Sequence, residues 1–270
     1  MKNILFTLLI SCGCLIGLMS NANAQTDKQY ELSCKNGDLA SCDQLAYLYQ
    51  EGTAEIPQDS AKAIEFYSQA CNANYAESCT NLGYLYRYST NIEQDNNKAF
   101  TFYKKACDLG NMTGCNNLAF LYHHGEGTDQ DTQQAFKLYE LACNGNESSG
   151  CYNLGNMYQE GDSVKQDVPK AMALYAKGCN NEHASSCNNI GYLYDNGEGV
   201  TQSYTLAAKY YKQACDLDES VGCYNLASLY EEGLGVRQNY AKSKELYQKS
   251  CALGDEDSCS AYADLYSNGY

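Results

Sequence analysis

The chain has 270 residues, with 33 Asp or Glu against 18 Lys or Arg, which gives a formal net charge of −15. This acidic balance argues against nucleic acid and anionic membrane surfaces as partners, because both are bound through clusters of Lys and Arg. Sixteen residues are cysteine, and their spacing carries most of the information in the sequence.

The first 24 residues are predicted to be a signal peptide. One positive charge at Lys2 precedes an apolar run from Ile4 to Met19, and the small residues up to Ala24 resemble a cleavage site before Gln25. The mature protein is therefore expected to begin near Gln25 and to lie outside the cytoplasm, in the periplasm or in the medium.

A lipoprotein signal is the alternative for this leader, with Leu9 to Cys12 as the cleavage box and a lipid on Cys12. The apolar run continues past this cysteine, so we favour the cleaved, unlipidated form. No later segment has the roughly 20 apolar residues that a membrane-spanning helix needs.

Residues 25–270 are predicted to form seven repeats of about 36 residues. The fourteen cysteines beyond the leader form seven C-x₇-C pairs, and successive first cysteines lie 37 residues apart once and then 36 apart five times. A period of this length is typical of helical-hairpin solenoids rather than of propellers or leucine-rich repeats.

The first helix of each repeat is predicted to start twelve residues before the first cysteine. Side chains that can accept a hydrogen bond from a first-turn N–H stand there in six repeats: Asp59, Asp95, Asp131, Asp167, Ser203 and Asn239. Small and aromatic residues follow at helical spacing, as in Ala99, Tyr103 and Ala106, so this helix has one buried stripe.

The second helix carries a similar stripe, as in Cys115, Leu118, Ala119 and Tyr122. It is expected to end at glycine-bearing links such as residues 125–127, where a positive φ stops the helix. Small residues facing tyrosines allow close antiparallel packing, so we interpret the recurring tyrosines as core residues.

The cysteines could be paired in two regular ways, within each C-x₇-C unit or from one repeat to the next. Pairing between repeats leaves Cys34 and Cys259 without partners, whereas pairing within units uses every thiol in a compartment where disulfides persist. We therefore predict the bonds Cys34–Cys42, Cys71–Cys79, Cys107–Cys115, Cys143–Cys151, Cys179–Cys187, Cys215–Cys223 and Cys251–Cys259.

Metal binding and thiol redox chemistry are the other roles that so many cysteines could serve. The C-x₂₋₄-C spacing of structural zinc sites does not occur, no C-x-x-C pair is present, and the histidines at 123, 124 and 183 do not recur with the repeat. We predict no metal and no cofactor.

The recurring motifs resemble those of the SEL-like repeat family. Lys98–Ala99 to Ala106–Cys107 shows the Lys-Ala-x-x-x-Tyr-x-x-Ala-Cys pattern, and Cys115 to Tyr122 shows Cys-x-Asn-Leu-Gly/Ala-x-Leu-Tyr. The cysteine pair in every repeat is similar to the secreted, cysteine-rich Hcp-type branch. The resemblance implies an all-α solenoid, a superhelix of seven disulfide-linked, tetratricopeptide-like antiparallel hairpins.

The same resemblance implies a penicillin-binding or weak β-lactamase activity, and hence a β-lactam or cell-wall-related ligand. Serine enzymes of this class need a Ser-x-x-Lys pair together with Ser-Asp-Asn and Lys-Thr-Gly, and none of the three occurs. We therefore predict no catalytic residue and keep the enzyme as an alternative that rests on resemblance alone.

An interaction module that binds an extended peptide or protein segment in a concave groove is the leading hypothesis. A row of amides, two residues after the second cysteine of five repeats, is the candidate ligand-binding column: Asn81, Asn117, Asn153, Asn189 and Asn225. An amide can both donate to and accept from a peptide backbone. The competing interpretation is that each Asn caps a carbonyl of the adjoining hairpin.

The C-terminal end of the repeat array is a further candidate surface. No polar helix follows the last repeat in this sequence, and solenoid ends usually carry a capping element. We expect self-association or partner binding near Tyr262 and Tyr266.

Overall fold

A computed structural model of the protein describes residues 28–54 and 56–269. The predicted signal peptide, residues 1–24, and the alternative lipidation site Cys12 lie outside this part of the chain. Every regular element in the described ranges is a helix, which confirms the all-α solenoid class. None of the helices in these ranges combines the length and the apolar character needed to cross a membrane.

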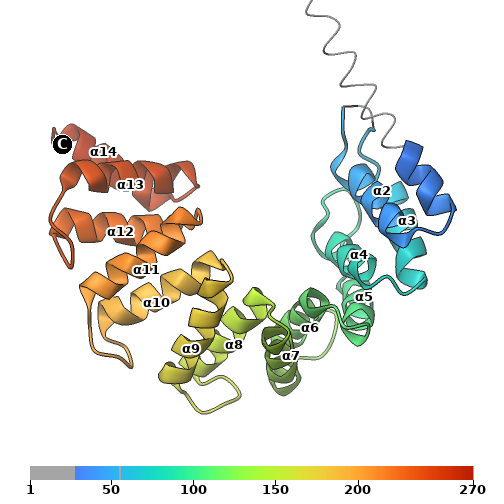
Figure 1. Ribbon diagram of the computed structural model, residues 1–270, viewed down its shortest axis with the longest axis horizontal. Helices are drawn as coiled ribbons and strands as arrows, with labels where there is room; N and C mark the ends of the chain where they lie inside the picture. The colour runs from blue at the N-terminus through green and yellow to red at the C-terminus, as the bar shows by residue number, and fades with distance from the viewer. Residues whose placement is uncertain (1–27, 55, 270) are drawn as a thin grey trace, which may run out of the picture. The chain divides into compact units, whose positions relative to one another are not determined.

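The helices fall into two compact units, divided after Asn111 (Figure 1). In the first unit residues 28–35 are helical and are followed by α2 (Leu39–Glu51), α3 (Ser60–Asn72), α4 (Ala76–Tyr88) and α5 (Asn96–Asp108). The second unit contains α6 (Met112–His124), α7 (Thr132–Asn144), α8 (Ser148–Glu160), α9 (Val168–Asn180), α10 (Ala184–Asn196), α11 (Tyr204–Asp216), α12 (Ser220–Glu232), α13 (Tyr240–Ala252) and α14 (Glu256–Ser267).

The predicted helix starts are confirmed at all six positions. Each predicted cap has an extended or non-helical backbone, and its side chain accepts a hydrogen bond from the backbone N–H three residues later. Asp59, for example, accepts from the N–H of Lys62 at 3.1 Å. Such a cap satisfies one of the first-turn donors that the helix leaves open and contributes about 1 kcal/mol.

The turns inside the hairpins share one backbone conformation. Three residues after each first cysteine the chain takes a positive φ, at Gly37, Asn74, Gly110, Asn146, Glu182, Asp218 and Gly254. Glycine adopts this conformation without strain, whereas an L-residue there loses roughly 1 kcal/mol. Every repeat therefore requires the same positive φ at this turn, and the conformational free energy that the turn costs depends on the residue that stands there.

The disulfides close these turns within each repeat, as predicted. Bonds join Cys34 to Cys42, Cys71 to Cys79, Cys143 to Cys151, Cys179 to Cys187, Cys215 to Cys223 and Cys251 to Cys259. Cys107 and Cys115 are also disulfide-bonded. By loop entropy, a bridge over so short a loop contributes roughly 2–3 kcal/mol, an upper value because native strain is ignored.

The core is built from tyrosine rings packed on small residues, as the facing stripes predict. The first-helix tyrosines from Tyr67 to Tyr247 are buried, with Tyr103 and Tyr175 fully covered. A Cβ added to Gly83 would lie 2.7 Å from the Tyr103 ring, and one added to Gly155 would lie 2.5 Å from the Tyr175 ring. The missing side chain therefore lets each ring lie against the neighbouring backbone.

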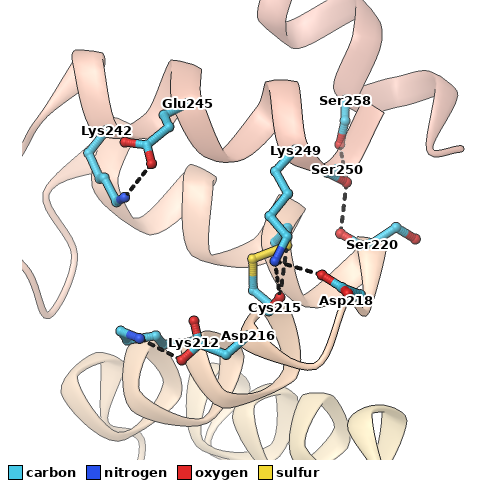
Figure 2. Close-up of a disulfide and its surroundings, with 11 residues drawn as sticks. Lys212, Cys215, Asp216, Asp218, Ser220, Lys242, Glu245, Lys249, Ser250 and Ser258 are labelled. Atoms are coloured by element: carbon cyan, nitrogen blue, oxygen red, sulfur yellow. Dashed lines mark hydrogen bonds and ion pairs between the residues drawn. A yellow bond between two sulfur atoms is a disulfide. The ribbon is translucent and has the colours of Figure 1, made fainter. Parts of the chain in front are cut away.

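Successive hairpins are also joined by polar contacts at the disulfide turns. Figure 2 shows Lys249 Nζ donating to the Cys215 carbonyl at 2.7 Å while it pairs with Asp218 at 2.8 Å. In the same view Ser258 donates to Ser250, whose hydroxyl donates to the Ser220 carbonyl. The contact from Lys249 gives the Cys215 carbonyl, which already accepts from the backbone N–H of Asp218, a second donor from the next hairpin.

Candidate functional site

The predicted amide column lies between neighbouring second helices and makes hydrogen bonds there. Asn81 Nδ2 donates to Asp43 Oδ1 at 3.1 Å, and Asn153 Nδ2 donates to Asn116 Oδ1 at 2.9 Å. Asn225 repeats this contact with Asn188 at 3.0 Å. The acceptor stands 37 or 38 residues earlier, one residue after the second cysteine of the preceding repeat.

Two members of the column differ. Asn189 donates to Asn156 at 3.4 Å, because residue 152 in the usual acceptor position is a tyrosine. Asn117 instead accepts from its neighbour Asn116 at 3.3 Å. All five amides are half-buried, and their partners are side chains rather than backbone carbonyls. The column thus has a structural role, and its ligand-binding role stays a prediction.

Asp43 is the one carboxylate among these acceptors, and it is buried. Its Oδ1 accepts from Ser78 Oγ at 2.6 Å and from Asn81 Nδ2 at 3.1 Å. Burial raises the pKa of this carboxyl group, and the two hydrogen bonds oppose that rise. Burial therefore disfavours the charged form of Asp43, so ionisation of this group costs stability in the folded chain.

A second set of residues is more suited to binding because it is exposed. Tyr47 on α2 and Tyr84 and Tyr88 on α4 expose 50%, 50% and 48% of their surface, unlike the buried core tyrosines. The hydrogen bonds from Asn81 and Ser78 to Asp43 join these two helices. We call Tyr47, Tyr84 and Tyr88 the tyrosine face.

The tyrosine face borders a shallow hollow of about 170 Å³. The hollow is lined by the end of α2, by the link between the first two repeats, and by α4 with its following residues: Gln50, Glu51, Gln58, Ser60, Tyr84, Leu85, Tyr88, Ser89, Thr90 and Asn91. It combines aromatic rings with amide, hydroxyl and carboxylate groups. Such a mixture suits a polar peptide chain better than a wholly apolar ligand.

Ring contacts order part of this surface. The Tyr84 and Tyr88 rings are 4.8 Å apart between centroids, and Arg87 Cζ lies 4.6 Å from the Tyr88 centroid. A cation over an aromatic face is attracted by the ring quadrupole. The exposed rings are thus partly fixed before any partner arrives, which lowers the entropy lost on binding.

Sequence reasoning missed the tyrosine face because it assigned the recurring tyrosines to the core. The available signal was register: Tyr47, Tyr84 and Tyr192 stand five residues after a second cysteine, whereas the buried first-helix tyrosines stand four residues before a first cysteine. Tyr192, in the second unit, is likewise 46% exposed.

The predicted surface near the last helix is aromatic and open. Tyr266 exposes 69% of its surface, and its ring lies 6.4 Å from that of Tyr262. Lys244 Nζ lies 5.8 Å from the Tyr266 centroid. Self-association through this surface stays a prediction.

The rings of His123 and His124 lie 4.9 Å apart between centroids, and His183 stands apart from them at the start of α10. His123 Nε2 is 2.7 Å from Asp162 Oδ2, and the His124 ring lies 4.1 Å from the Phe120 ring. His183 caps α10 through the N–H of Ser186. Over the described ranges no three His, Cys, Asp or Glu side chains are grouped to hold a metal ion.

The solved structures that resemble the chain include the following two. A protective antigen of uropathogenic Escherichia coli, c5321, which has an SLR fold, is 28% identical with a TM-score of 0.76; the match covers 90% of this chain and 52% of the antigen. Helicobacter pylori cysteine rich protein B is 32% identical with a TM-score of 0.41; that match covers 49% of this chain and 95% of the other protein.

A curated relative matches over a shorter stretch. Cytochrome c oxidase assembly factor 7A of Xenopus laevis is 31% identical over 72 residues, which is 26% of this chain and 31% of that protein. The chain therefore spans about a third of this relative and about half of the E. coli antigen.

The family model called Sel1 repeat matches six consecutive segments, residues 39–75, 76–111, 113–147, 148–183, 184–219 and 220–255. Each matched segment begins at or next to a second helix and ends in the turn that follows the next first helix. Because these segments cover most of the sequence and coincide with its structural repeat, the chain belongs to the Sel1 repeat family.

Proposed function

We propose that the protein is an exported interaction module that binds an extended peptide or protein segment through the tyrosine face. Sel1 repeats generally serve as protein-interaction modules, and the sequence contains none of the three serine β-lactamase motifs. The observation that carries the proposal is the exposure of Tyr47, Tyr84 and Tyr88 in one compact unit, whereas most of the other tyrosines in the described ranges are buried or half-buried.

Exposed tyrosines suit this role for a physical reason. A tyrosine ring offers a large, rigid contact area with a polar tip, and tyrosine is enriched among residues that dominate binding energy. Tyr84 and Tyr88 stand on one helix, and α2 and α4 are fixed to each other through Asp43. An extended segment lying across both helices would contact all three rings.

The cellular compartment follows from the disulfides together with the predicted leader. Disulfide bonds in every repeat indicate an oxidising environment. Export by cleavage near Gln25 would deliver the chain to the periplasm or beyond. A fusion of residues 1–30 to a reporter enzyme that is active only outside the cytoplasm tests this part of the proposal, and an inactive, uncleaved fusion would contradict it.

The binding site is tested by selecting a random peptide library displayed on phage against the disulfide-intact protein. We expect enrichment on the wild-type chain and its loss on the double variant Tyr84→Ala/Tyr88→Ala. Loss of one dominant tyrosine typically weakens binding about 30-fold, so the double variant should fall below detection. Both rings are half exposed, so the variant should keep its helices and its unfolding temperature.

A matched control comes from Tyr266, which is more exposed than either ring of the tyrosine face. Tyr266→Ala should enrich the same peptides as the wild-type chain. If Tyr266→Ala abolishes enrichment and the double variant retains it, the peptide binds at α14 near Tyr266 and not at the tyrosine face. Light scattering on the wild-type chain would show whether that end instead binds a second copy.

A further inference from the structure

The hollow beside the tyrosine face contains one carboxylate, that of Glu51, the last residue of α2. Its side chain is exposed, and its hydrogen bond within the described residues comes from the neighbouring Gln50, whose Nε2 donates to Glu51 Oε1 at 3.0 Å. No Lys or Arg of the described ranges pairs with Glu51 or lines the hollow. The helix dipole disfavours negative charge at the end of a helix, so helix stability does not account for this carboxylate.

Two aromatic rings line the same hollow. Tyr84 and Tyr88 stand one turn apart on α4, with ring centroids 4.8 Å apart. Arg87 lies over the Tyr88 ring, whereas no cation of the described residues lies over the Tyr84 ring. A hollow of about 170 Å³ has room for the end of one side chain. A carboxylate beside an aromatic ring is a combination that attracts a cation.

The repeat does not produce this combination everywhere, as the second unit shows. Glu232 ends α12 as Glu51 ends α2, because each is the thirteenth residue of its helix. At the positions that the two rings occupy on α4, the sequence of the last repeat has Asp264 and Asn268. A cation beside Glu232 would therefore meet no ring at these positions, and Glu232 is the matched control for Glu51.

We infer that Glu51 and Tyr84 form a subsite for a cationic side chain, Lys or Arg, of the bound peptide. The inference rests on the proposed function and deepens it, because it assigns one basic residue to the segment that crosses the tyrosine face. Glu51 Oε2 accepts no hydrogen bond within the described residues, so it is open to the ligand's N–H groups. The methylene groups and the charge of the same side chain lie against the Tyr84 ring.

The charge of the chain agrees with a cationic ligand. The net charge of −15 attracts basic peptides and speeds their approach. At physiological ionic strength this attraction is screened beyond about 8 Å, so it does not fix where on the surface a cation binds. General attraction would enrich basic residues at any position of a peptide, whereas the subsite enriches them at one.

The variant Glu51→Gln separates this subsite from the rest of the tyrosine face. It removes the charge and keeps the shape, and its amide oxygen can still accept from Gln50. On the wild-type chain, the phage selection should enrich peptides with Lys or Arg at one fixed position. On Glu51→Gln it should still enrich peptides, through Tyr84 and Tyr88, but with a basic residue less often at that position. Glu232→Gln removes the same charge and should give the wild-type result.

Synthetic peptides from the wild-type selection complete the test. Acetylation of the fixed Lys, or replacement of the fixed Arg by citrulline, removes the positive charge. An exposed ion pair and a cation–π contact each change affinity a few-fold, so this change should weaken binding to the wild-type chain about tenfold. On Glu51→Gln, and on Tyr84→Leu, one of the two contacts remains, and the factor should fall to about threefold. An equal factor on all three proteins would overturn the assignment.

The N-terminal amine of the peptide is the other source of a cation. Its acetylation should leave the affinity for the wild-type chain unchanged, because the segment carries the cation on a side chain. A loss as large as that caused by the side-chain change would contradict a side-chain subsite.

The remaining outcomes distinguish this inference from the proposed function. Enrichment on the wild-type chain without a fixed basic position contradicts the cation subsite alone, and so does the same basic position at the same frequency on Glu51→Gln. An empty selection on the wild-type chain contradicts the proposed function and this inference with it.

Discussion

Removing the hydroxyl group from either of two equivalent buried tyrosines should change the free energy of unfolding differently, because only one of the two hydroxyls has hydrogen-bond partners. Tyr103 and Tyr175 are both fully buried and both pack on a glycine of the preceding second helix. The Tyr175 hydroxyl lies 2.6 Å from Asn156 Oδ1 and 2.8 Å from Gln159 Oε1, whereas the Tyr103 hydroxyl has no partner in the described part of the chain. The substitutions Tyr103→Phe and Tyr175→Phe therefore change the same atom in the same setting.

The expected magnitudes follow from the hydrogen bonds. Tyr175→Phe removes a donor from partly buried acceptors and should lower the free energy of unfolding by about 1–2 kcal/mol. Tyr103→Phe removes a desolvated, unpaired hydroxyl and should leave the free energy of unfolding unchanged or raise it by about 1 kcal/mol. The two variants should thus differ by roughly 2 kcal/mol.

Urea unfolding of the disulfide-intact proteins, followed by far-ultraviolet circular dichroism, measures this difference. With a denaturant dependence of about 2 kcal/mol per M, the transition midpoints of the two variants should differ by about 1 M. Because repeat proteins can unfold in parts, amide hydrogen exchange in α5 and α9 should report the same ranking locally. Equal losses in both variants would refute the reasoning and show that the Tyr103 hydroxyl is satisfied in solution.

Three further predictions concern charge, backbone strain and enzymatic activity. Asp43→Asn should raise the free energy of unfolding at pH 7 by about 1 kcal/mol, because the amide oxygen can still accept from Ser78 and Asn81 while the buried charge is removed. The pKa of Asp43 is raised in the folded chain, so the unfolded chain loses this proton first as the pH rises. Wild-type stability should therefore fall relative to Asp43→Asn above the unfolded pKa of about 3.9, and the two proteins should be equally stable below it; a pH-independent difference in urea midpoints would contradict this. Glu182→Gly should raise the thermal unfolding midpoint, because glycine adopts the positive φ of 62° without strain, and the free energy of unfolding should rise by up to about 1 kcal/mol. Gly110→Ala, at the equivalent turn, should lower the midpoint. If neither substitution moves the midpoint, the turn is not strained. A chromogenic cephalosporin should not be hydrolysed above a heat-denatured control, since the sequence has no Ser-x-x-Lys pair, and steady turnover by the purified protein would revive the enzyme.

The repeat architecture could be predicted from sequence because its signals are local and periodic. Asp95 caps α5, and the glycine at 125 ends α6 with a positive φ, because both depend on a few neighbouring residues in a fixed register. The disulfides followed from the same register. Six caps and seven cysteine pairs in one register make the pattern stronger than a single helix boundary would be.

The candidate site could not be predicted in the same way because it depends on exposure and on departures from the repeat. Tyr84 and the half-buried Tyr86 stand on the same helix and differ in the direction they face, which depends on how neighbouring helices pack. The partner of Asn153 is a side chain 37 residues away, beyond any local pattern. That the Tyr103 hydroxyl lacks a partner within the described residues stands out only when the acceptors at equivalent positions in other repeats are known.

Photo-crosslinking from the tyrosine face tests the central claim most directly. A photoreactive phenylalanine derivative at position 47 replaces a half-exposed ring on α2, and the same residue at position 266 serves as the control. With a peptide from the wild-type selection, we expect a crosslink from position 47 and none from position 266, and Tyr84→Ala/Tyr88→Ala in the same chain should abolish it. A crosslink from position 266 alone would contradict the claim that the tyrosine face binds the partner.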